Sequence, residues 1–260
     1  MLNSKINIIG MCHLLKMPGD PNFNSNKGLE ETINRARKDI KNLQQNGVSK
    51  ILFSNEFSYP YTNRLDAVTV LSMAYIVGAL KNELSVPFGV DCMYDSYSTI
   101  DLANATNADF YRITLPYSTP SDYSLGTTNI GHIIRYSRNY KYSSNARILL
   151  NISEPLTHAI NNRNYDLLLE NIVVQINPYA ICISADNYIS IQRECAIQNI
   201  KKKFNKTLFY CDGGCNQNNI SSIISCLDGA IIGTAFKEKN ILSNPIDEKN
   251  VHKIINQIPK

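Results

Sequence analysis

Apolar residues along this chain gather in short continuous runs, and longer stretches with apolar residues at helical spacing separate them. The runs predict β-strands at residues 6–12, 50–54, 87–93, 109–115, 147–152, 180–184, 207–211 and 229–232. Continuous runs, rather than strict alternation, are typical of a parallel sheet that is covered on both faces. Intervening stretches such as 29–45 and 65–84 keep one apolar face and predict amphipathic helices.

Strand and helix patterns alternate eight times within 260 residues. This count and length predict an α/β fold, a single closed (β/α)8 TIM barrel, rather than an open doubly wound sheet. No linker or low-complexity block divides the sequence, so we expect residues 1–260 to form a single TIM-barrel domain. The absence of a GxGxxG motif after the first run also argues against a Rossmann fold.

Composition narrows the class of protein further. Hydrophobic residues make up 43% of the chain and charged residues 18%, which excludes a disordered protein and allows a large core. The net charge is only +4 and the longest basic run is 201–203, so no nucleic-acid partner is expected. The first apolar run is short and contains His13, so we expect no membrane partner, whereas a homo-oligomer stays open.

The chain contains seven cysteines and shows no signal peptide, which predicts reduced thiols and a cytoplasmic location. Cys12, Cys92, Cys182 and Cys211 fall in or at the end of predicted strands, where cysteine behaves as a small buried hydrophobe. The alternative is a metal or thiolate site made from Cys211, Cys215 and either Cys12 or His13. A single CxxxC lacks the paired spacing that is typical of zinc sites.

Two glycine turns follow the last two predicted strands. The first contains Gly213 and Gly214, and the second contains Gly233 and Thr234. Glycine lets backbone N–H groups approach an anion closely, and the loops after strands seven and eight of a TIM barrel often hold a phosphate. We therefore expect these four residues to bind the phosphate of a substrate, although both turns could simply connect a strand to a helix.

Polar residues also gather at the predicted carboxyl ends of the strands, where a TIM barrel carries its active site. These candidates are His13, Asn55, Glu56, Asp91, Asp95, Arg112, Asn151, Glu154, Asp186 and Asp212. Five or six carboxylates around one histidine and one arginine are more polar groups than packing requires. Asp95 and Asp186 are also well placed to cap the helices that follow them.

Several motifs occur in an order that resembles the BtpA family of TIM-barrel proteins, most closely its SgcQ-like branch. They include the segments 8–14, 53–58 with 60–61, 87–90, 108–112, 128–131 and 233–234 with 236–238. The resemblance extends over nearly the whole chain and implies a TIM barrel. It leaves the reaction open, because the family's name comes from a proposed part in photosystem I assembly while other members resemble enzymes.

The candidate residues suit proton transfer beside a carbonyl group. Glu56 or Asp91 would act as the general base, and Arg112 would hold a carboxylate or stabilise an enolate oxygen. His13 and Asp212 are further catalytic candidates, and His13 would otherwise be a structural histidine. We expect substrate contacts from Asn55, Asn151, Glu154, Asp186, Gly213, Gly214, Gly233 and Thr234. This chemistry predicts an isomerase, epimerase or lyase that acts on a small phosphorylated, sugar-phosphate-like metabolite.

Two other functions stay open. The carboxylates Glu56, Asp91, Asp95 and Asp212 would suit Mg²⁺ or Mn²⁺, which would allow hydrolysis or glycosyl transfer on a nucleotide-like phosphate ester. The barrel could instead be a non-catalytic assembly factor. For Glu56 itself, the alternative to catalysis is a buried structural ion pair with Arg112.

Overall fold

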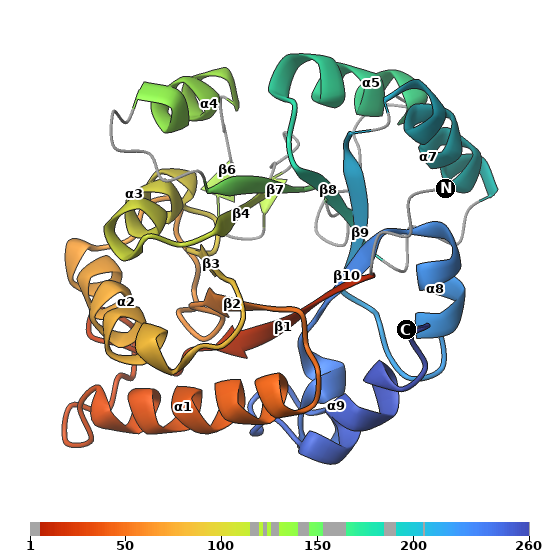
Figure 1. Cartoon of the computed structure of the whole chain (residues 1–260). Helices are drawn as coiled ribbons and strands as arrows, with labels where there is room; N and C mark the ends of the chain where they lie inside the picture. Colours follow the sequence, from red (N-terminus) through yellow and green to blue (C-terminus); the bar gives the residue numbers. More distant parts are fainter. Residues whose placement is uncertain are drawn as a thin grey trace.

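Eight parallel strands form a closed ring at the centre of the protein (Figure 1). The computed structural model describes residues 6–114, 120–121, 124–125, 130–139, 146–152, 165–184, 191–204 and 206–259. The ring runs in the order β1-β10-β9-β8-β7-β4-β3-β2. Its strands are β1 (Asn7–His13), β2 (Lys50–Ser54), β3 (Phe88–Asp91), β4 (Phe110–Thr114), β7 (Arg147–Asn151), β8 (Ala180–Ile183), β9 (Leu208–Asp212) and β10 (Gly229–Ile232).

Closure of the ring depends on β1, which pairs with β2 on one side and with β10 on the other. Asn7 lies opposite Gly229, and Gly10 lies opposite Ile51. Every strand therefore has two hydrogen-bonded neighbours, and the predicted closed (β/α)8 TIM barrel is confirmed. Each predicted strand is present with its ends shifted by no more than two residues.

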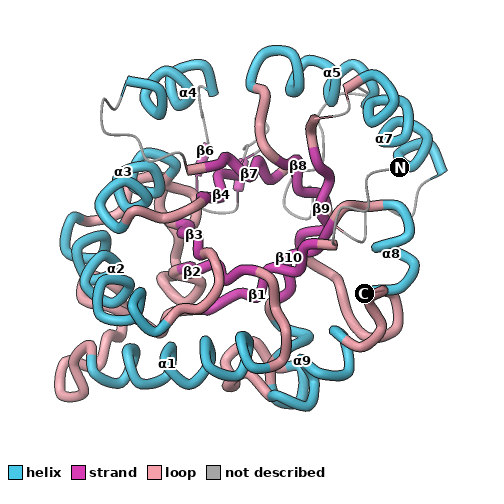
Figure 2. Tube along the Cα trace, viewed as in Figure 1, coloured by secondary structure: helices cyan, strands magenta, loops and turns pink. Residues whose placement is uncertain are grey.

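Helices surround the ring and cover the outer face of its strands (Figure 2). They are α1 (Glu30–Gln45), α2 (Ala67–Leu80), α3 (Ser96–Thr106), α4 (Ile130–Asn139), α5 (Tyr165–Ile176), α7 (Ile191–Lys203), α8 (Ile220–Cys226) and α9 (Glu248–Ile255). Three short 3₁₀-helices, η1 (Lys81–Glu83), η2 (Thr234–Phe236) and η3 (Glu238–Asn240), and a small hairpin of β5 (Pro120–Ser121) and β6 (Ser124–Leu125) lie between them. As predicted, α1 buries one apolar stripe against the barrel, made of Ile33, Ala36, Ile40 and Leu43.

Side chains of successive strand residues point alternately into the ring and outward to the helices. The inward set fills the barrel with Ile9, Met11, Leu52, Phe110, Leu149, Ala180, Cys182, Tyr210 and Ile231. The four cysteines expected to be buried, Cys12, Cys92, Cys182 and Cys211, are free and buried. The interior is thus a packed core that ends where the inward positions become polar.

Candidate functional site

A polar layer caps the apolar interior at the carboxyl ends of the strands. On five strands, a polar residue stands two positions after an inward-facing apolar residue and so faces the same way. These five residues are His13, Arg112, Asn151, Ser184 and Asp212, and all of them line one cavity of about 880 Å³. The alternation of side chains along each strand therefore brings these polar groups together at the mouth of the barrel.

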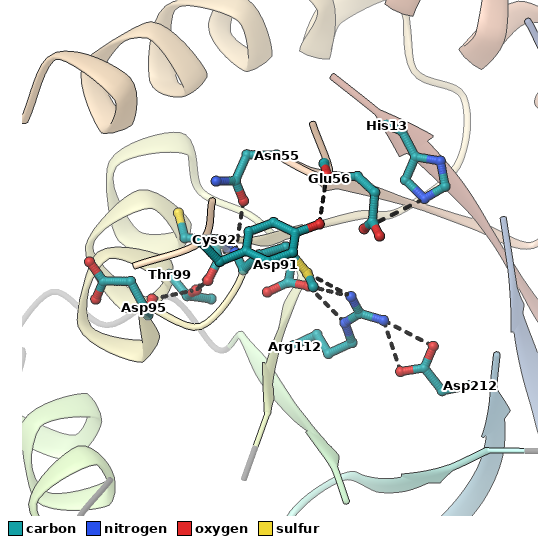
Figure 3. A network of polar contacts seen from close by, with 11 residues as sticks. His13, Asn55, Glu56, Asp91, Cys92, Asp95, Thr99, Arg112 and Asp212 are labelled. Atoms are coloured by element: carbon teal, nitrogen blue, oxygen red, sulfur yellow. Dashed lines mark hydrogen bonds and ion pairs between the residues drawn. The ribbon is translucent and has the colours of Figure 1, made fainter. Parts of the chain in front are cut away.

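Arg112 is held at this mouth by two carboxylates from strands on either side of the ring (Figure 3). Its Nε lies 2.8 Å from Asp91 Oδ2, and its Nη1 lies 2.8 Å and 2.9 Å from the two carboxylate oxygens of Asp212. Burial lowers the pKa of the guanidinium, but Asp212 and Asp91 outweigh it and raise that pKa above its ordinary value. The charged fork of Arg112 is consequently fixed in one orientation.

One N–H of this guanidinium has only a weak partner. Arg112 Nη2 lies 2.5 Å from Asp91 Oδ2 and 3.5 Å from the thioether sulfur of Met93, so one of its two N–H groups pairs with the carboxylate and the other reaches the sulfur. Met93 also lines the cavity. A thioether is a poor hydrogen-bond acceptor, so an oxyanion would replace it with a large gain in hydrogen-bond strength. Arg112 therefore has one donor to offer to a bound molecule.

Glu56 and His13 form a second, looser pair on the other side of the mouth (Figure 3). Their nearest atoms, His13 Nε2 and Glu56 Oε2, are 4.0 Å apart. Burial raises the pKa of the Glu56 carboxyl; Arg112 lowers that pKa, while Asp91 and Asp212 raise it further. Burial, aided by the positive charges of Lys237 and Arg112, lowers the pKa of His13, which favours its neutral form. This pair can exchange a proton with a molecule in the cavity.

Packing around His13 fixes the ring in this position. A Cβ atom built on Gly233 would lie 2.7 Å from His13 Cε1, so only glycine leaves room for the imidazole there. The Nδ1 atom of His13 is buried, and no described residue forms a hydrogen bond with it. Among the described residues, the imidazole is therefore positioned by packing contacts and not by a hydrogen bond to Nδ1.

The glycine turns line the same cavity. Gly213 and Gly214 have φ angles of +90° and +76°, which non-glycine residues rarely adopt. The carbonyl of Gly214 accepts hydrogen bonds from the side chains of Asn216 and Asn219, at 3.2 Å and 2.9 Å. Among the described residues, none accepts a hydrogen bond from the backbone N–H groups of Gly214 and Thr234. Both turns thus line the cavity with residues whose backbone N–H groups no described residue occupies.

The remaining candidates differ in their placement. Asn55 is buried and its Oδ1 accepts a hydrogen bond of 2.7 Å from the Met93 N–H, so it supports the loop that carries Met93. Asn151 lines the cavity. Glu154 and Asp186 lie outside the described residues. Asp95 lies away from the cavity because its carboxylate caps α3 by accepting from Ser98 N–H at 3.0 Å.

No group of three or more metal-binding side chains occurs within the described ranges. The expected set of four carboxylates is divided, because Asp95 caps a helix and Arg112 already binds Asp91 and Asp212. A divalent cation would have to displace the guanidinium, so the residues present fit Mg²⁺ or Mn²⁺ poorly.

Sequence reasoning missed several residues that line the cavity, among them Ser184, Met93 and Lys253. Ser184 has a buried hydroxyl for which the described residues supply no hydrogen-bond partner. It stands two positions after the inward-facing Cys182, and this spacing could have identified it. Lys253 comes from α9, and no pattern in the sequence relates this helix to the mouth.

Comparison with known proteins agrees with this architecture. The profile of the BtpA family matches residues 4–260. The chain belongs to the BtpA family. A putative sgc region protein, SgcQ, of Escherichia coli K12 is 30% identical over 251 residues, which cover 96% of this chain and 93% of SgcQ. The predicted family and its SgcQ-like branch are confirmed.

Two further comparisons place this BtpA-family chain among known barrels. The photosystem I biogenesis protein BtpA of Synechocystis is 24% identical, over 95% of this chain and 86% of that protein. The structure of N-(5'-phosphoribosyl)anthranilate isomerase from Pyrococcus furiosus superposes with a TM-score of 0.56 at 9% identity, covering 97% and 98% of the two chains. Across the described residues, no helix has the length and apolar character needed to cross a membrane.

Proposed function

We propose that this protein is an enzyme that moves a proton beside a carbonyl group of a small phosphorylated metabolite, as an isomerase, epimerase or lyase does. The observation that carries this proposal is the arrangement of one cavity. Glu56 and His13 form an acid–base pair at one side, and Arg112 presents a fixed positive charge at the other. The glycine turns lie in the same cavity and supply a place for a phosphate.

The phosphate would bind at the turns after β9 and β10. The free N–H groups of Gly214 and Thr234 would donate to its oxygens, and Lys253 would add a positive charge on the same wall. The similarity in fold to a phosphoribosyl-anthranilate isomerase supports a phosphorylated substrate, because that enzyme's name describes a phosphate-bearing compound. A phosphate fixed there would leave the carbon chain facing Glu56 and Arg112.

The chemical step would then begin at Glu56. Its carboxylate takes a proton from the carbon beside the carbonyl, and the electron pair moves onto the carbonyl oxygen. The resulting enolate oxygen accepts a hydrogen bond from Arg112 Nη2, in place of the Met93 sulfur. Return of the proton to the neighbouring carbon gives an isomer, and return to the same carbon from its other face gives an epimer. Neutral His13 is placed to donate to the substrate and to take up the exchanged proton.

The contacts of Arg112 also bear on the choice of general base and on the alternative functions. Asp91 is tied to Arg112, so we assign the base to Glu56 and a clamping role to Asp91 and Asp212. Metal-assisted hydrolysis or glycosyl transfer has less support because the guanidinium lies between these two carboxylates. A non-catalytic assembly role finds support in the name of the Synechocystis relative. It would be favoured if the wild type bound none of the phosphorylated compounds in the assay below. The free thiols of the described cysteines suit a reducing compartment such as the cytoplasm.

The test is a thermal-shift and calorimetric panel of inorganic phosphate, sugar phosphates and nucleotides against the wild type and Gly214→Asp. We expect stabilisation by at least one phosphorylated compound, by about 2.7 kcal/mol at a concentration of a hundred times Kd. Gly214→Asp should abolish binding of that compound at the mouth, because its carboxylate takes the place of the phosphate and repels it. Gly78→Asp on the exposed side of α2, far from the cavity, is the matched control.

The proposed phosphate site at the turns after β9 and β10 is wrong if no phosphorylated compound stabilises the wild type, or if Gly214→Asp binds as the wild type does. A circular-dichroism melt of Gly214→Asp separates a lost ligand from a lost fold.

A further inference from the structure

A second cavity lies at the opposite, amino-terminal end of the barrel. Its volume is about 400 Å³. Lys50 and Arg147 are the first residues of β2 and β7, and Tyr179 directly precedes β8, so all three come from the end of the ring away from the mouth. Tyr210 reaches the same cavity from the middle of β9, inside the barrel. None of these residues contributes to the lining of the cavity at the mouth.

Two cations share one aromatic ring at this end. Lys50 Nζ lies 5.6 Å from the centre of the Tyr179 ring, and Arg147 Cζ lies 4.5 Å from it. Within the part of the chain that the structure describes, neither cation has a carboxylate within ion-pairing distance; Lys50 donates to Asn7 Oδ1 at 2.8 Å. Asp109 is the carboxylate among the residues lining this cavity, and one of its oxygens already accepts from the Phe88 N–H at 2.9 Å. The cavity therefore has an excess of positive charge.

Tyr210 adds an independent observation. Its side chain is fully buried, and within the described ranges no group accepts a hydrogen bond from its hydroxyl, beside which the Tyr179 side chain lies. The ring is held against Gly229, where a Cβ atom would lie 3.0 Å from Tyr210 Cε1. A buried hydroxyl without an acceptor is unfavourable, and an oxygen atom of a ligand in the adjoining cavity would satisfy it.

We propose that this amino-terminal cavity binds a small oxyanion through Lys50, Arg147 and the hydroxyl of Tyr210. The three groups are all donors and two are cationic, so the complementary ligand carries several acceptor oxygens and a negative charge, as a phosphate or a carboxylate does. Ile9, Phe110 and Leu149 line the rest of the cavity and leave room for a small apolar body attached to the anion. The site is separate from the proposed active site and does not depend on it.

The experiment measures binding of inorganic phosphate and of malonate by calorimetry in the Gly214→Asp background, where the mouth is blocked. We expect one of the two anions to bind, and Arg147→Gln and Tyr210→Phe each to weaken that binding at least tenfold. Arg37→Gln removes an exposed arginine elsewhere and should leave the affinity unchanged. Arg147 is exposed, so its replacement should not disturb folding.

Thermal melts give a second measure. Tyr210→Phe should melt at or above the wild-type temperature without anion, and should lose the rise in melting temperature that the anion produces. The proposal would be overturned if neither anion bound to Gly214→Asp, or if Arg147→Gln and Tyr210→Phe in that background bound the anion as strongly as Gly214→Asp alone. Failure of the proposed function instead appears as phosphate binding that Gly214→Asp does not reduce, so the two results are distinguishable.

Discussion

Two buried cations in this protein, Arg112 and Lys237, show how similar ion pairs serve different ends. Arg112 lies at the mouth of the barrel between Asp91 and Asp212, and it borders a cavity. Lys237 follows η2 and is fully buried, with its Nζ 3.0 Å from Asp39 Oδ2 on α1. Both cations tie together segments that are far apart in the sequence.

The two ion pairs differ in how fully their carboxylate oxygens are used by the protein and in whether a cavity borders them. Around Lys237, the protein itself uses both carboxylate oxygens of Asp39, since Ile246 N–H donates to Oδ1 at 2.8 Å and Arg35 Nε lies 3.3 Å from each oxygen. Arg112 borders the cavity, where its Nη2 pairs with Asp91 and also reaches the weakly accepting sulfur of Met93. The Lys237 network is closed in the sense that both acceptor oxygens of Asp39 are used, and it lies away from the cavity, so it stabilises the fold. Arg112 borders the cavity and can also act on a ligand.

The largest expected effect is on the closed network. Lys237→Met should lower the free energy of unfolding by about 3–5 kcal/mol, because it leaves the buried charge of Asp39 short of its partner. Urea denaturation measures this change. Lys249→Met, at an exposed position of α9, is the control and should stay within about 0.5 kcal/mol of the wild type. Equal stability of both variants would remove the distinction between the two networks.

At the mouth, Glu56→Gln should reduce turnover of the substrate by about a hundredfold or more, or about 2.7 kcal/mol, because the amide cannot accept the proton. The melting temperature should not fall, since no ion pair between Glu56 and Arg112 is present among the described residues. Glu31→Gln on α1 is the matched control. A variant that melts early but turns over normally per folded molecule would show that Glu56 is structural.

Arg112→Lys tests the clamp with the charge retained. A lysine ammonium cannot reach Asp91 and Asp212 together in the fork geometry of a guanidinium, so the free energy of unfolding should fall by about 1–3 kcal/mol. Denaturation and ligand calorimetry on the same protein measure both losses. Arg37→Lys, whose partner Glu83 is exposed, should change neither quantity. A larger loss of stability than in Lys237→Met would reverse the comparison of the two networks.

The smallest effect concerns pH. Burial raises the pKa of Glu56 in the folded protein above its unfolded value, so the folded state favours the protonated form. That contribution to stability is fully present below the unfolded pKa of about 4.5 and is lost as the pH rises through the folded pKa. Melts from pH 4 to pH 8 should therefore show Glu56→Gln gaining stability relative to the wild type as the pH rises. A difference that is constant over this range would contradict the raised pKa.

The sequence predicted the barrel well because its signal is local. Each strand is a continuous apolar run. The alternation of side chains along a strand is enough to place His13, Arg112 and Asp212 inside the ring at its carboxyl end. The pairing of these residues was not predictable in the same way. Arg112 meets Asp212 across 100 residues, and Lys237 meets Asp39 across 198, so only the closed ring brings them together.

Local signals were also ambiguous where one residue type has two uses. Asp95 and Asp212 both follow a strand, yet Asp95 caps α3 while Asp212 binds Arg112. The alternative pairing of Glu56 with Arg112 could not be rejected from the sequence, because the choice among three nearby carboxylates depends on side-chain geometry. The roles of the individual site residues remain predictions for the experiments above.

The pairing of β1 with β10 has a consequence for how the chain is made. Asn7 finds its neighbour Gly229 only after nearly all of the protein has left the ribosome. At about 5–20 residues per second, β1 waits roughly 10 to 45 seconds with one edge unpaired. An exposed apolar edge of this kind invites pairing with other nascent chains. The ring that removes every edge in the finished barrel thus leaves β1 with one open edge until the last strand emerges.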